Sequence, residues 1–324
     1  MYKKKPKVFI TRRLPKKIET RMMELFDTTL NEKDVLLTED ELIDVFKDYE
    51  IIVPSIADNI SKKIIESSSE KTKLIANFGA GIDHIDLKTA KSRDIIVTNT
   101  PGLLAEDTAD LVLTLMLALP RRIYEGSKIV VQGKWNGWSP THMLGSRIHG
   151  KRLGIIGMGR IGQAIAKRAK VFGISIHYHN RNQLPSQIEE AYEATYWKNL
   201  GEMVKRMDIV SINCPLTEKT KGMISENILE LMMPNSYIIN SSRSEIIDEK
   251  ALVRMLKEKK IAGAGLDVFG AEKKLKTELL DLPNTILIPH MGSATVEGRI
   301  EMGEKVIVNI KTFIDGHNPP NRII

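Results

Sequence analysis

The chain has 324 residues, of which 42% are hydrophobic and 27% charged, with a formal net charge of +7 and a single cysteine. This length and apolar content predict about two folded domains. The single cysteine excludes an internal disulfide, and the lysines are scattered among acidic residues rather than gathered in a stripe, which argues against a nucleic-acid partner.

Nothing in the sequence has the character of a membrane anchor or a secretion signal. The N-terminal lysines lead directly into an apolar segment without a small-residue cleavage site. The longest apolar run, 111–119, is interrupted by Thr114 and followed by Pro120, so it falls short of the roughly 20 residues of a membrane helix. We therefore expect a cytoplasmic protein with no membrane partner.

The first hundred residues alternate short apolar segments with amphipathic ones. They predict strands at 8–10, 51–53, 74–76 and 95–97, with helices at 17–25 and 39–46. Alternation of this kind indicates a parallel sheet covered by helices on both faces. The following segment, 105–119, is apolar on nearly every face, so we predict a helix buried all round by the core or by a partner subunit.

A second alternating series begins after Gly150. It predicts a helix at 163–172 and strands at 152–156, 174–178, 209–213, 237–240, 262–266 and 285–288. The two series together indicate an α/β fold made of two units.

A glycine-rich segment follows the first strand of the second series and opens its first helix. Its residues are Gly157, Met158, Gly159, Arg160, Ile161 and Gly162. In this context the first glycine permits a tight turn, the second admits a pyrophosphate, and the third lets helix and strand pack closely. The helix N-terminus then faces the anion. The segment predicts a dinucleotide site.

The next strand bears on the choice between NAD and NADP. NAD enzymes carry an acidic residue at its end, about 20 residues on, that binds the ribose 2′-hydroxyl. Here the position 18 residues past Gly162 holds Asn180, followed by Arg181 and Asn182. Asparagine does not repel a 2′-phosphate, and arginine can pair with one through two hydrogen bonds. The sequence favours NADP(H), with NAD(H) as the alternative.

Residues suited to keto-acid reduction stand at the ends of three late strands. Arg243 has a fork that matches a carboxylate, and His290 has a pKa suited to proton donation near neutral pH. Glu272 follows the strand between them in the sequence. Because ligands of open α/β sheets bind beyond the carboxyl ends of the strands, these three residues are expected to converge.

Six ordered segments carry a family resemblance that spans nearly the whole chain. They are Asn77 to Asp83 (NFGAGID), Thr98 to Gly102 (TNTPG), the glycine segment, Cys214 to Thr217 (CPLT), Ile239 to Arg243 (INSSR) and Pro289 to Ser293 (PHMGS). In these segments the chain resembles the D-isomer-specific 2-hydroxyacid dehydrogenase family. The resemblance implies two doubly wound parallel-sheet domains, a Rossmann-type dinucleotide domain and a flavodoxin-like substrate domain.

The resemblance also implies roles for matching residues. Arg243 would bind the substrate carboxylate and polarise the keto oxygen, His290 would be the general acid, and Glu272 would raise the pKa of His290. Asp267 would orient the nicotinamide carboxamide. Further cofactor contacts would come from the glycine segment and from Cys214, Pro215, Ser241, Ser242 and Gly292. The substrate would be bound by backbone groups of Ala80 and Gly81, together with Ser293 and Trp138.

The family arrangement implies discontinuous domains. Residues 1–100 and 294–324 would form the substrate domain, and 101–293 the dinucleotide domain, with a hinge at the two crossovers. The apolar helix at 105–119 would belong to a homodimer interface. The segment Trp135 to Pro140 (WNGWSP) is similar to glyoxylate and hydroxypyruvate reductases. In that group the tryptophan matching Trp138 reaches the neighbouring active site, although Trp138 as simple interface packing stays open.

Some features depart from the family or point elsewhere. Ser244 and Lys273 replace the glycine and the proline that usually follow the catalytic arginine and glutamate. His177 and His179 form an H-x-H pair, but no third ligand has suitable spacing, so we expect no metal. The favoured function is reduction of glyoxylate or hydroxypyruvate. The alternatives are a D-lactate- or phosphoglycerate-type dehydrogenase, or a dinucleotide-sensing scaffold like the corepressors of this fold.

Overall fold

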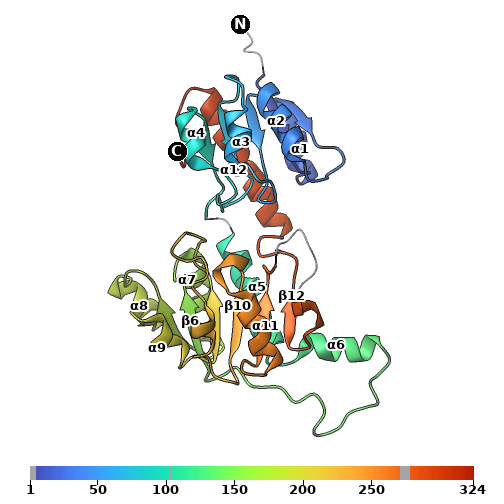
Figure 1. The fold of residues 1–324 in the computed structure, drawn as a ribbon, viewed down its shortest axis with the longest axis vertical. Coiled ribbons are helices and arrows are strands. Elements are labelled where there is room, and N and C mark those ends of the chain that lie inside the picture. The colour runs from blue at the N-terminus through green and yellow to red at the C-terminus, as the bar shows by residue number, and fades with distance from the viewer. Residues whose placement is uncertain (1–4, 103, 271–277) are drawn as a thin grey trace. The chain divides into compact units, whose positions relative to one another are not determined.

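The computed structural model describes residues 5–102, 104–270 and 278–324. The chain divides into two compact units (Figure 1). Unit 1 consists of Met1–Leu103 and Ala294–Ile324, and unit 2 consists of Leu104–Ser293. In the described part of the chain, no helix is both long enough and apolar enough to cross a membrane.

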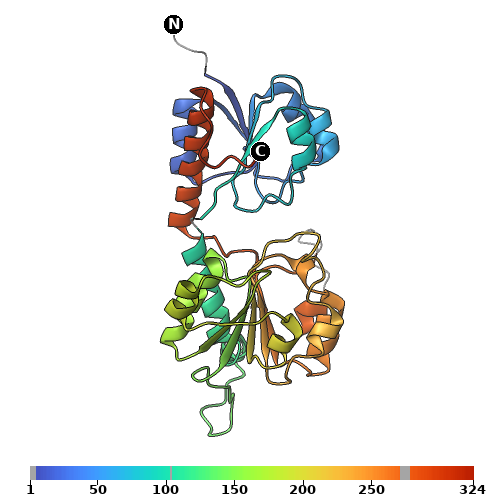
Figure 2. The ribbon, with the colours of Figure 1, turned by 90° about the vertical axis from the view of Figure 1, so that its left-hand side faces the viewer.

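Unit 1 is a five-stranded parallel sheet in the order β2-β1-β3-β4-β5. The strands are β1 (Lys7–Ile10), β2 (Asp27–Leu30), β3 (Ile51–Val53), β4 (Leu74–Ala76) and β5 (Ile96–Thr98). The helices are α1 (Lys16–Leu25), α2 (Glu39–Asp48), α3 (Lys62–Glu66), α4 (Leu87–Ser92) and α12 (Val296–Ile314). Helices α1 and α12 pack together on one face, and α2, α3 and α4 cover the other (Figure 2). This order is that of flavodoxin-like folds.

The strands β3 and β4 of unit 1 are short, and every residue in them is buried. All three residues of β3, Ile-Ile-Val, and all three of β4, Leu-Ile-Ala, lie in the core. Continuous apolar runs are expected where helices cover both faces of a parallel sheet. Strand β2, with the sequence Asp-Thr-Thr-Leu, lies at the edge and is half exposed, so it lacked the apolar pattern from which strands were predicted.

Unit 2 is a seven-stranded parallel sheet in the order β12-β11-β10-β9-β6-β7-β8. The strands are β6 (Arg152–Ile156), β7 (Ser175–His179), β8 (Thr195–Tyr196), β9 (Ile209–Ile212), β10 (Tyr237–Asn240), β11 (Gly263–Leu266) and β12 (Thr285–Leu287). The α-helices are α5 (Ala105–Ala118), α6 (Ile123–Val131), α7 (Arg160–Val171), α8 (Ser186–Tyr192), α9 (Leu200–Val204), α10 (Glu226–Leu229) and α11 (Glu249–Lys257). Short 3-10 turns cover Ser244–Ile246 and Glu278–Asp281.

The order of the seven strands is that of a dinucleotide-binding fold with an extra strand at one edge. From β6 the chain first builds outward through β7 and β8, and then returns to β9 on the other side of β6. The predicted fold class, two doubly wound parallel sheets, is confirmed. Strand β8 was not predicted, because two residues at a sheet edge leave no periodic signal.

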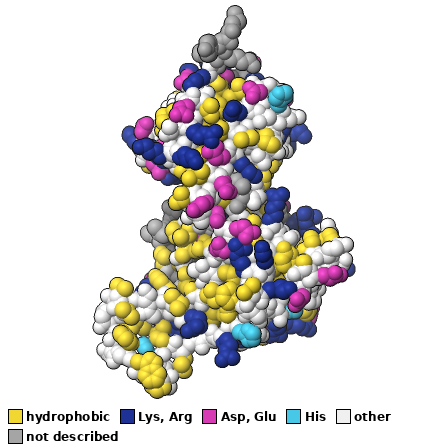
Figure 3. Space-filling view, turned by 180° about the vertical axis from the view of Figure 1, so that it is seen from behind, with side chains coloured by type: hydrophobic (Ala, Val, Ile, Leu, Met, Phe, Trp, Pro, Cys, Tyr) yellow, Lys and Arg dark blue, Asp and Glu magenta, His cyan; other side chains and the backbone are white. Residues whose placement is uncertain are grey.

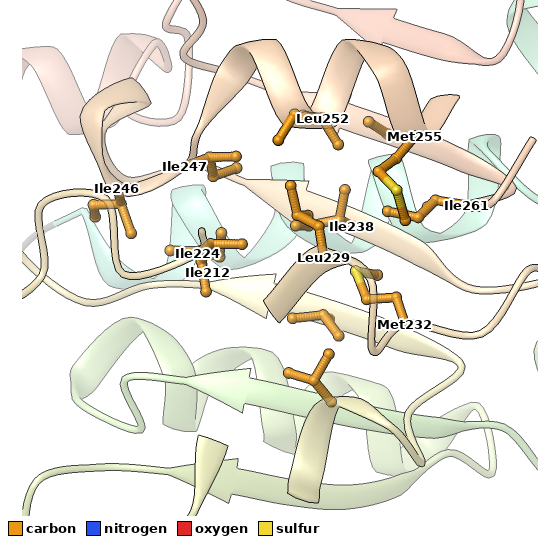
Figure 4. Packing of buried hydrophobic residues seen from close by; sticks show 14 of the residues in the cluster. Ile212, Ile224, Leu229, Met232, Ile238, Ile246, Ile247, Leu252, Met255 and Ile261 are labelled. Atoms are coloured by element: carbon orange, nitrogen blue, oxygen red, sulfur yellow. The ribbon is translucent and has the colours of Figure 1, made fainter. Parts of the chain in front are cut away.

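Two hydrophobic clusters cover the two faces of the sheet in unit 2. One contains Ala109, Val112 and Met116 of α5 with Ile165 and Ala169 of α7. The other joins α10 and α11 to β9 and β10, and Figure 4 shows Leu229 and Leu252 near Ile238, with Ile212 beside Ile224. Because its helices are held on both faces, the sheet provides a rigid frame for the loops at its strand ends.

Helix α5 is not buried all round within the chain. Its Glu106, Asp110 and Thr114 form an exposed strip, and Arg168 of α7 bonds to both Glu106 and Asp110. The core of the chain alone therefore does not cover this helix on every side, and its burial by a partner subunit stays a prediction. These polar residues recur every four positions, so they lie on one side of the helix, and that side is exposed to solvent.

Candidate active site

The glycine segment lies where the order of the sheet in unit 2 reverses. It connects β6 to α7, and β6 is flanked by β9 on one side and β7 on the other. In open α/β sheets, ligands bind outside the carboxyl ends of the strands at this switch point. The position of the segment is therefore that of a ligand-binding turn.

The three glycines of the segment differ in why a side chain would or would not fit at their positions. Gly157 has a φ of +95°, and a Cβ there would lie 2.7 Å from the backbone nitrogen of Cys214. A Cβ on Gly162 would lie 2.5 Å from the carbonyl oxygen of Gly157. At Gly159, by contrast, a Cβ would meet nothing within 4 Å, and the residue is exposed. The open side of Gly159 is thus where a pyrophosphate can approach the backbone.

Helix α7 presents free backbone donors beside this open space. It runs for 12 residues from Arg160, and no side chain caps its N-terminus. The first N–H groups of a helix lack intrahelical acceptors, and the helix dipole favours an anion there. The turn, the open side of Gly159 and this helix terminus fit a dinucleotide phosphate without rearrangement.

Asn180 ties the end of β7 to the glycine segment. Its side-chain Oδ1 accepts a hydrogen bond of 2.8 Å from the backbone N–H of Met158. The side chain of Met158 itself is fully buried, so its backbone is the part available to a ligand. Arg181 and Asn182 follow Asn180 and are exposed. At the end of β7, Asn180 therefore presents an amide and Arg181 an exposed guanidinium, and neither residue carries a carboxylate.

A clamp that was not predicted from the sequence holds the segment after Asn182. The hydroxyl of Tyr178 donates to Glu189 at 2.6 Å and accepts from the N–H of Leu184 at 2.9 Å. Gln183 also donates to the same carboxylate. Burial and the adjacent carboxylate raise the pKa of Tyr178 to about 12. A tyrosine in a strand is typical of the core, and the two partners of its hydroxyl, Glu189 of α8 and the backbone of Leu184, lie farther along the chain.

The turn after β10 is closed by the last residue of that strand. Asn240 accepts from the N–H of Ser242 at 3.0 Å, and its amide nitrogen donates to the carbonyl of Arg243 at 2.8 Å. The Ser242 hydroxyl donates to the carbonyl of Cys214, which follows β9. These bonds fix the backbone from which the Arg243 side chain extends. Ser241 lies in the same turn, and its hydroxyl reaches Asn213 at 3.4 Å.

His290 follows β12 and has an uncommon backbone conformation. Its φ is +48°, a left-handed value that is uncommon for a residue other than glycine. The N–H of His290 donates to the carbonyl of Asp267 at 2.9 Å. The Asp267 carboxylate accepts from the N–H groups of Met291 at 2.6 Å and Gly292 at 2.9 Å. A buried aspartate after β11 thus holds the turn that carries His290, and such backbone outliers cluster at functional sites.

Arg243, Asp267 and His290 follow three neighbouring parallel strands, β10, β11 and β12. The carboxyl ends of these strands meet at one edge, so the structure places the three residues along that edge of the sheet. Gly292 adds a further link, since its carbonyl accepts from the hydroxyl of Thr108 at 3.1 Å. Glu272 and Lys273 lie outside the described residues.

Cys214 is suited to packing rather than to reaction. It is buried at the end of β9, and burial raises the pKa of its thiol to about 11. At neutral pH the group is a thiol, which is a poor nucleophile. The neighbouring Pro215 is exposed. Any contact of Cys214 with a cofactor would come from the backbone that packs against Gly157.

The two histidines of the H-x-H pair each have a structural partner. The Trp197 indole N–H donates to Nδ1 of His177 at 3.2 Å, and Nδ1 of His179 lies 2.8 Å from the Trp197 carbonyl. Burial, followed by the charge of Arg152, lowers the pKa of His177. Across the described residues, no group of three or more histidine, cysteine or acidic side chains could hold a metal ion.

The remaining predicted residues lie on loops. Ala80 is exposed and Gly81 is partly exposed in the loop after β4 of unit 1. In unit 2, Ser293 follows Gly292 and is partly buried. Trp138 lies in the segment after α6 and is 83% exposed. A tryptophan this exposed buries little of its ring against its own chain.

Comparison with known proteins identifies the family of the chain. Residues 113–292 match the family model described as D-isomer specific 2-hydroxyacid dehydrogenase, NAD binding domain. The chain is 42% identical to a glyoxylate reductase of Thermococcus litoralis over 323 residues, covering 98% of this chain and 97% of the relative.

Two solved structures are also similar. A glyoxylate reductase from Paecilomyes thermophila has a TM-score of 0.85 and 30% identity, covering 100% of this chain and 99% of its own. An NADPH-dependent glyoxylate/hydroxypyruvate reductase from Sinorhizobium meliloti, in complex with NADP and malonate, has a TM-score of 0.87 and 31% identity. That similarity covers 98% of this chain and 97% of the relative.

Proposed function

The chain belongs to the D-isomer specific 2-hydroxyacid dehydrogenase family, and on this premise we propose that it reduces glyoxylate or hydroxypyruvate to the D-2-hydroxy acid with NADPH. Membership makes the protein an oxidoreductase that uses a nicotinamide dinucleotide and a small keto or hydroxy acid. The choice of substrate rests on one observation. Relatives similar over nearly the full length of the chain are glyoxylate reductases.

The proposed mechanism assigns a role to each of the predicted site residues. The Arg243 guanidinium is proposed to pair with the substrate carboxylate and to polarise the keto oxygen. Backbone N–H groups of Ala80 and Gly81 are also proposed to bind the substrate carboxylate. His290 donates a proton to the oxygen as negative charge develops on it. Glu272 is proposed to act as the partner of His290. The glycine segment would hold a nicotinamide dinucleotide, which would supply the hydride when bound.

The remaining cofactor contacts are proposed from the same turns. The α7 N-terminus and the backbone of Met158 to Ile161 would receive the pyrophosphate. The nicotinamide half would be held by Ser241, Ser242, Pro215, Gly292 and the Cys214 backbone. Asp267 accepts from the nicotinamide carboxamide while it also holds the Met291 and Gly292 N–H groups, since each carboxylate oxygen has two acceptor sites.

Preference for NADP(H) over NAD(H) is proposed from the end of β7. Asn180 is uncharged and accepts from Met158, and Arg181 is exposed beside it. This arrangement leaves a guanidinium to pair with a ribose 2′-phosphate and has no carboxylate to repel it. The NADP complex of the Sinorhizobium meliloti relative is consistent with this choice.

A homodimer is proposed from the surface around α6. This helix has no buried residue although its sequence is Ile-Tyr-Glu-Gly-Ser-Lys-Ile-Val-Val. Figure 3 shows hydrophobic side chains gathered over α6 and the segment after it. The exposed apolar side chains there are Ile123, Tyr124, Val130, Val131, Trp135, Trp138 and Leu144. Exposed apolar patches of this kind mark protein interfaces, and Trp138 is proposed to extend to the substrate of the partner subunit.

The test is the initial rate of NADPH and NADH oxidation with glyoxylate, hydroxypyruvate and pyruvate. We expect the fastest oxidation with NADPH and either glyoxylate or hydroxypyruvate. Fastest turnover of pyruvate would instead favour a D-lactate-type enzyme. Tight NADPH binding without oxidation by any of the three keto acids would contradict the proposed reduction and favour a dinucleotide-sensing scaffold.

A further inference from the structure

Two asparagines outside the proposed catalytic residues turn their amides toward the same loop. Asn77 follows β4 directly, and Asn99 follows the neighbouring strand β5. The Asn77 amide nitrogen donates to the carbonyls of Gly79 at 3.0 Å and Gly81 at 2.8 Å. The Asn99 amide nitrogen donates to the carbonyl of Ala80 at 2.8 Å. Both asparagines are buried.

Every carbonyl of the loop 79–81 is therefore engaged from the side of the sheet. The Gly79 carbonyl also accepts from the N–H of Thr100 at 3.0 Å. In a trans peptide the C=O and the following N–H lie in one plane and point in opposite directions. Fixing the carbonyls of Gly79 and Ala80 thus turns the N–H groups of Ala80 and Gly81 away from the sheet.

Those N–H groups lie on the exposed side of the loop. Ala80 is exposed and Gly81 is partly exposed. Among the described residues, no group accepts a hydrogen bond from the N–H of Ala80 or Gly81. Two adjacent donors with fixed directions are the arrangement that a carboxylate, with its two oxygens, accepts best.

The two amides are themselves held in place. Nε2 of His84 lies 3.1 Å from Oδ1 of Asn77. Because the Asn77 nitrogen faces two carbonyls, its oxygen faces His84, and His84 donates to it. Asn99 is anchored through its backbone, which accepts from the amide of Asn309 on α12 at 3.2 Å and donates to the carbonyl of Asn321 at 3.2 Å. The loop is thus preorganised by a connected polar network.

We propose that Asn77 and Asn99 are positioning residues that aim the backbone N–H groups of Ala80 and Gly81 at the carboxylate of the substrate. This inference rests on the proposed function, in which that loop binds the carboxylate. It goes further by naming the side chains that set the direction of the donors. His84 takes part by orienting the Asn77 amide.

The test compares Asn77→Ser and Asn99→Ser with Asn31→Ser. Asn31 is a matched control in the same unit, because its amide nitrogen also donates to two carbonyls, those of Thr11 at 2.8 Å and Val35 at 2.7 Å. Steady-state kinetics with glyoxylate and calorimetric titration with oxalate in the presence of NADPH are measured for each variant. The melting temperature and the Kd for NADPH are measured alongside.

In both loop variants we expect the KM for glyoxylate and the Kd for oxalate to rise about 10- to 100-fold, the range for a lost hydrogen bond to a charged group. The kcat and the Kd for NADPH should stay near those of the wild type, and Asn31→Ser should leave all four constants unchanged. A merely structural role would lower the melting temperature of all three variants without this selective loss. Oxalate binding that is equally tight in the loop variants and in Asn31→Ser would overturn the proposal.

Two further outcomes separate this inference from the proposed function. If the wild type binds oxalate but reduces no keto acid, the proposed reduction fails, and selective loss of oxalate in the loop variants still supports the positioning role. If the wild type does not bind oxalate, the positioning role is wrong. Should Asn77→Ser fail to fold, Asn99→Ser decides the question, because its amide reaches the Ala80 carbonyl independently.

Discussion

The side-chain oxygen of Asn180 accepts a 2.8 Å hydrogen bond from the backbone N–H of Met158, which links the end of β7 to the turn after β6. An aspartate at position 180 could accept the same bond, because a carboxylate oxygen replaces the amide oxygen without a change of shape. The one change would be a negative charge beside the proposed 2′-phosphate. The contact therefore offers a way to test cofactor choice while leaving the glycine turn in place.

We predict that Asn180→Asp weakens NADPH binding by at least about tenfold through charge repulsion and leaves NADH binding nearly unchanged. Arg181→Ala should weaken NADPH by about 10- to 100-fold, since it removes a charge-assisted bond to the phosphate. Fluorescence titration of both cofactors provides the constants. Asn199→Asp serves as the control, because Asn199 caps α9 and aspartate caps equally well. Equal weakening of NADPH and NADH by Arg181→Ala would contradict the phosphate-binding role.

A second prediction concerns the proton donor. We expect His290→Asn to lower kcat by about 100- to 10,000-fold, the usual contribution of general acid catalysis, with the Kd for NADPH unchanged. Asparagine is preferred to alanine because it tolerates the left-handed backbone seen at φ +48°. Stopped-flow and steady-state rates give the loss. The exposed His317, changed to asparagine, is the control. Turnover that survives His290→Asn would mean that another group donates the proton.

Much of the fold could be predicted because its signals are local. Parallel strands buried on both faces appear as short apolar runs, so β6 and β10 were predicted to the residue. The edge strands β2 and β8 were missed, because half-exposed polar strands lack that signal. The ion pairs of Glu106 and Asp110 on α5 with Arg168 on α7 were not predicted, because sequence periodicity does not reveal contacts between separate helices.

The candidate site also contains features that were predicted from the sequence and contacts that were not. Gly157 and Asn180 were predicted to lie at the ends of adjacent strands, because the spacing from a strand to its loop is fixed along the chain. The carboxylate of Asp267 on the Gly292 N–H and the amide of Asn99 on the Ala80 carbonyl were not predicted as contacts. Each joins segments from different strands, and only the register of the sheet brings them together.

A third prediction follows from the Tyr178 hydroxyl. Its pKa is raised from 10.0 to about 12, so the neutral form is favoured in the folded state. The stability it contributes is fully present below pH 10 and is lost as the pH rises toward 12. We expect the difference in the free energy of unfolding between wild type and Tyr178→Phe to shrink over this range. Urea unfolding at several pH values measures it.

Comparison with Tyr178→Phe removes the effect of the lysines, which titrate in both proteins. Near neutral pH the same variant frees Leu184 and Glu189 from the clamp, so it should also weaken NADPH through the preceding loop. A difference in stability that stays constant from pH 9 to pH 12 would show that the hydroxyl does not titrate as described.

The last prediction concerns the surface of α6. Val131 is 84% exposed on a helix with no buried residue, and a glutamate there would place a charge in the proposed interface between two copies. A buried and unpaired charge is strongly unfavourable, so Val131→Glu should shift the protein from dimer to monomer at micromolar concentration. Light scattering coupled to size-exclusion chromatography measures the mass, for which one chain contributes 36.5 kDa. Val171→Glu is the matched control, since Val171 is 86% exposed at the end of α7.

If Trp138 reaches the partner's substrate, the monomer should also have a higher KM for the keto acid. A wild-type mass of one chain, or a dimer unaffected by Val131→Glu, would rule out this interface.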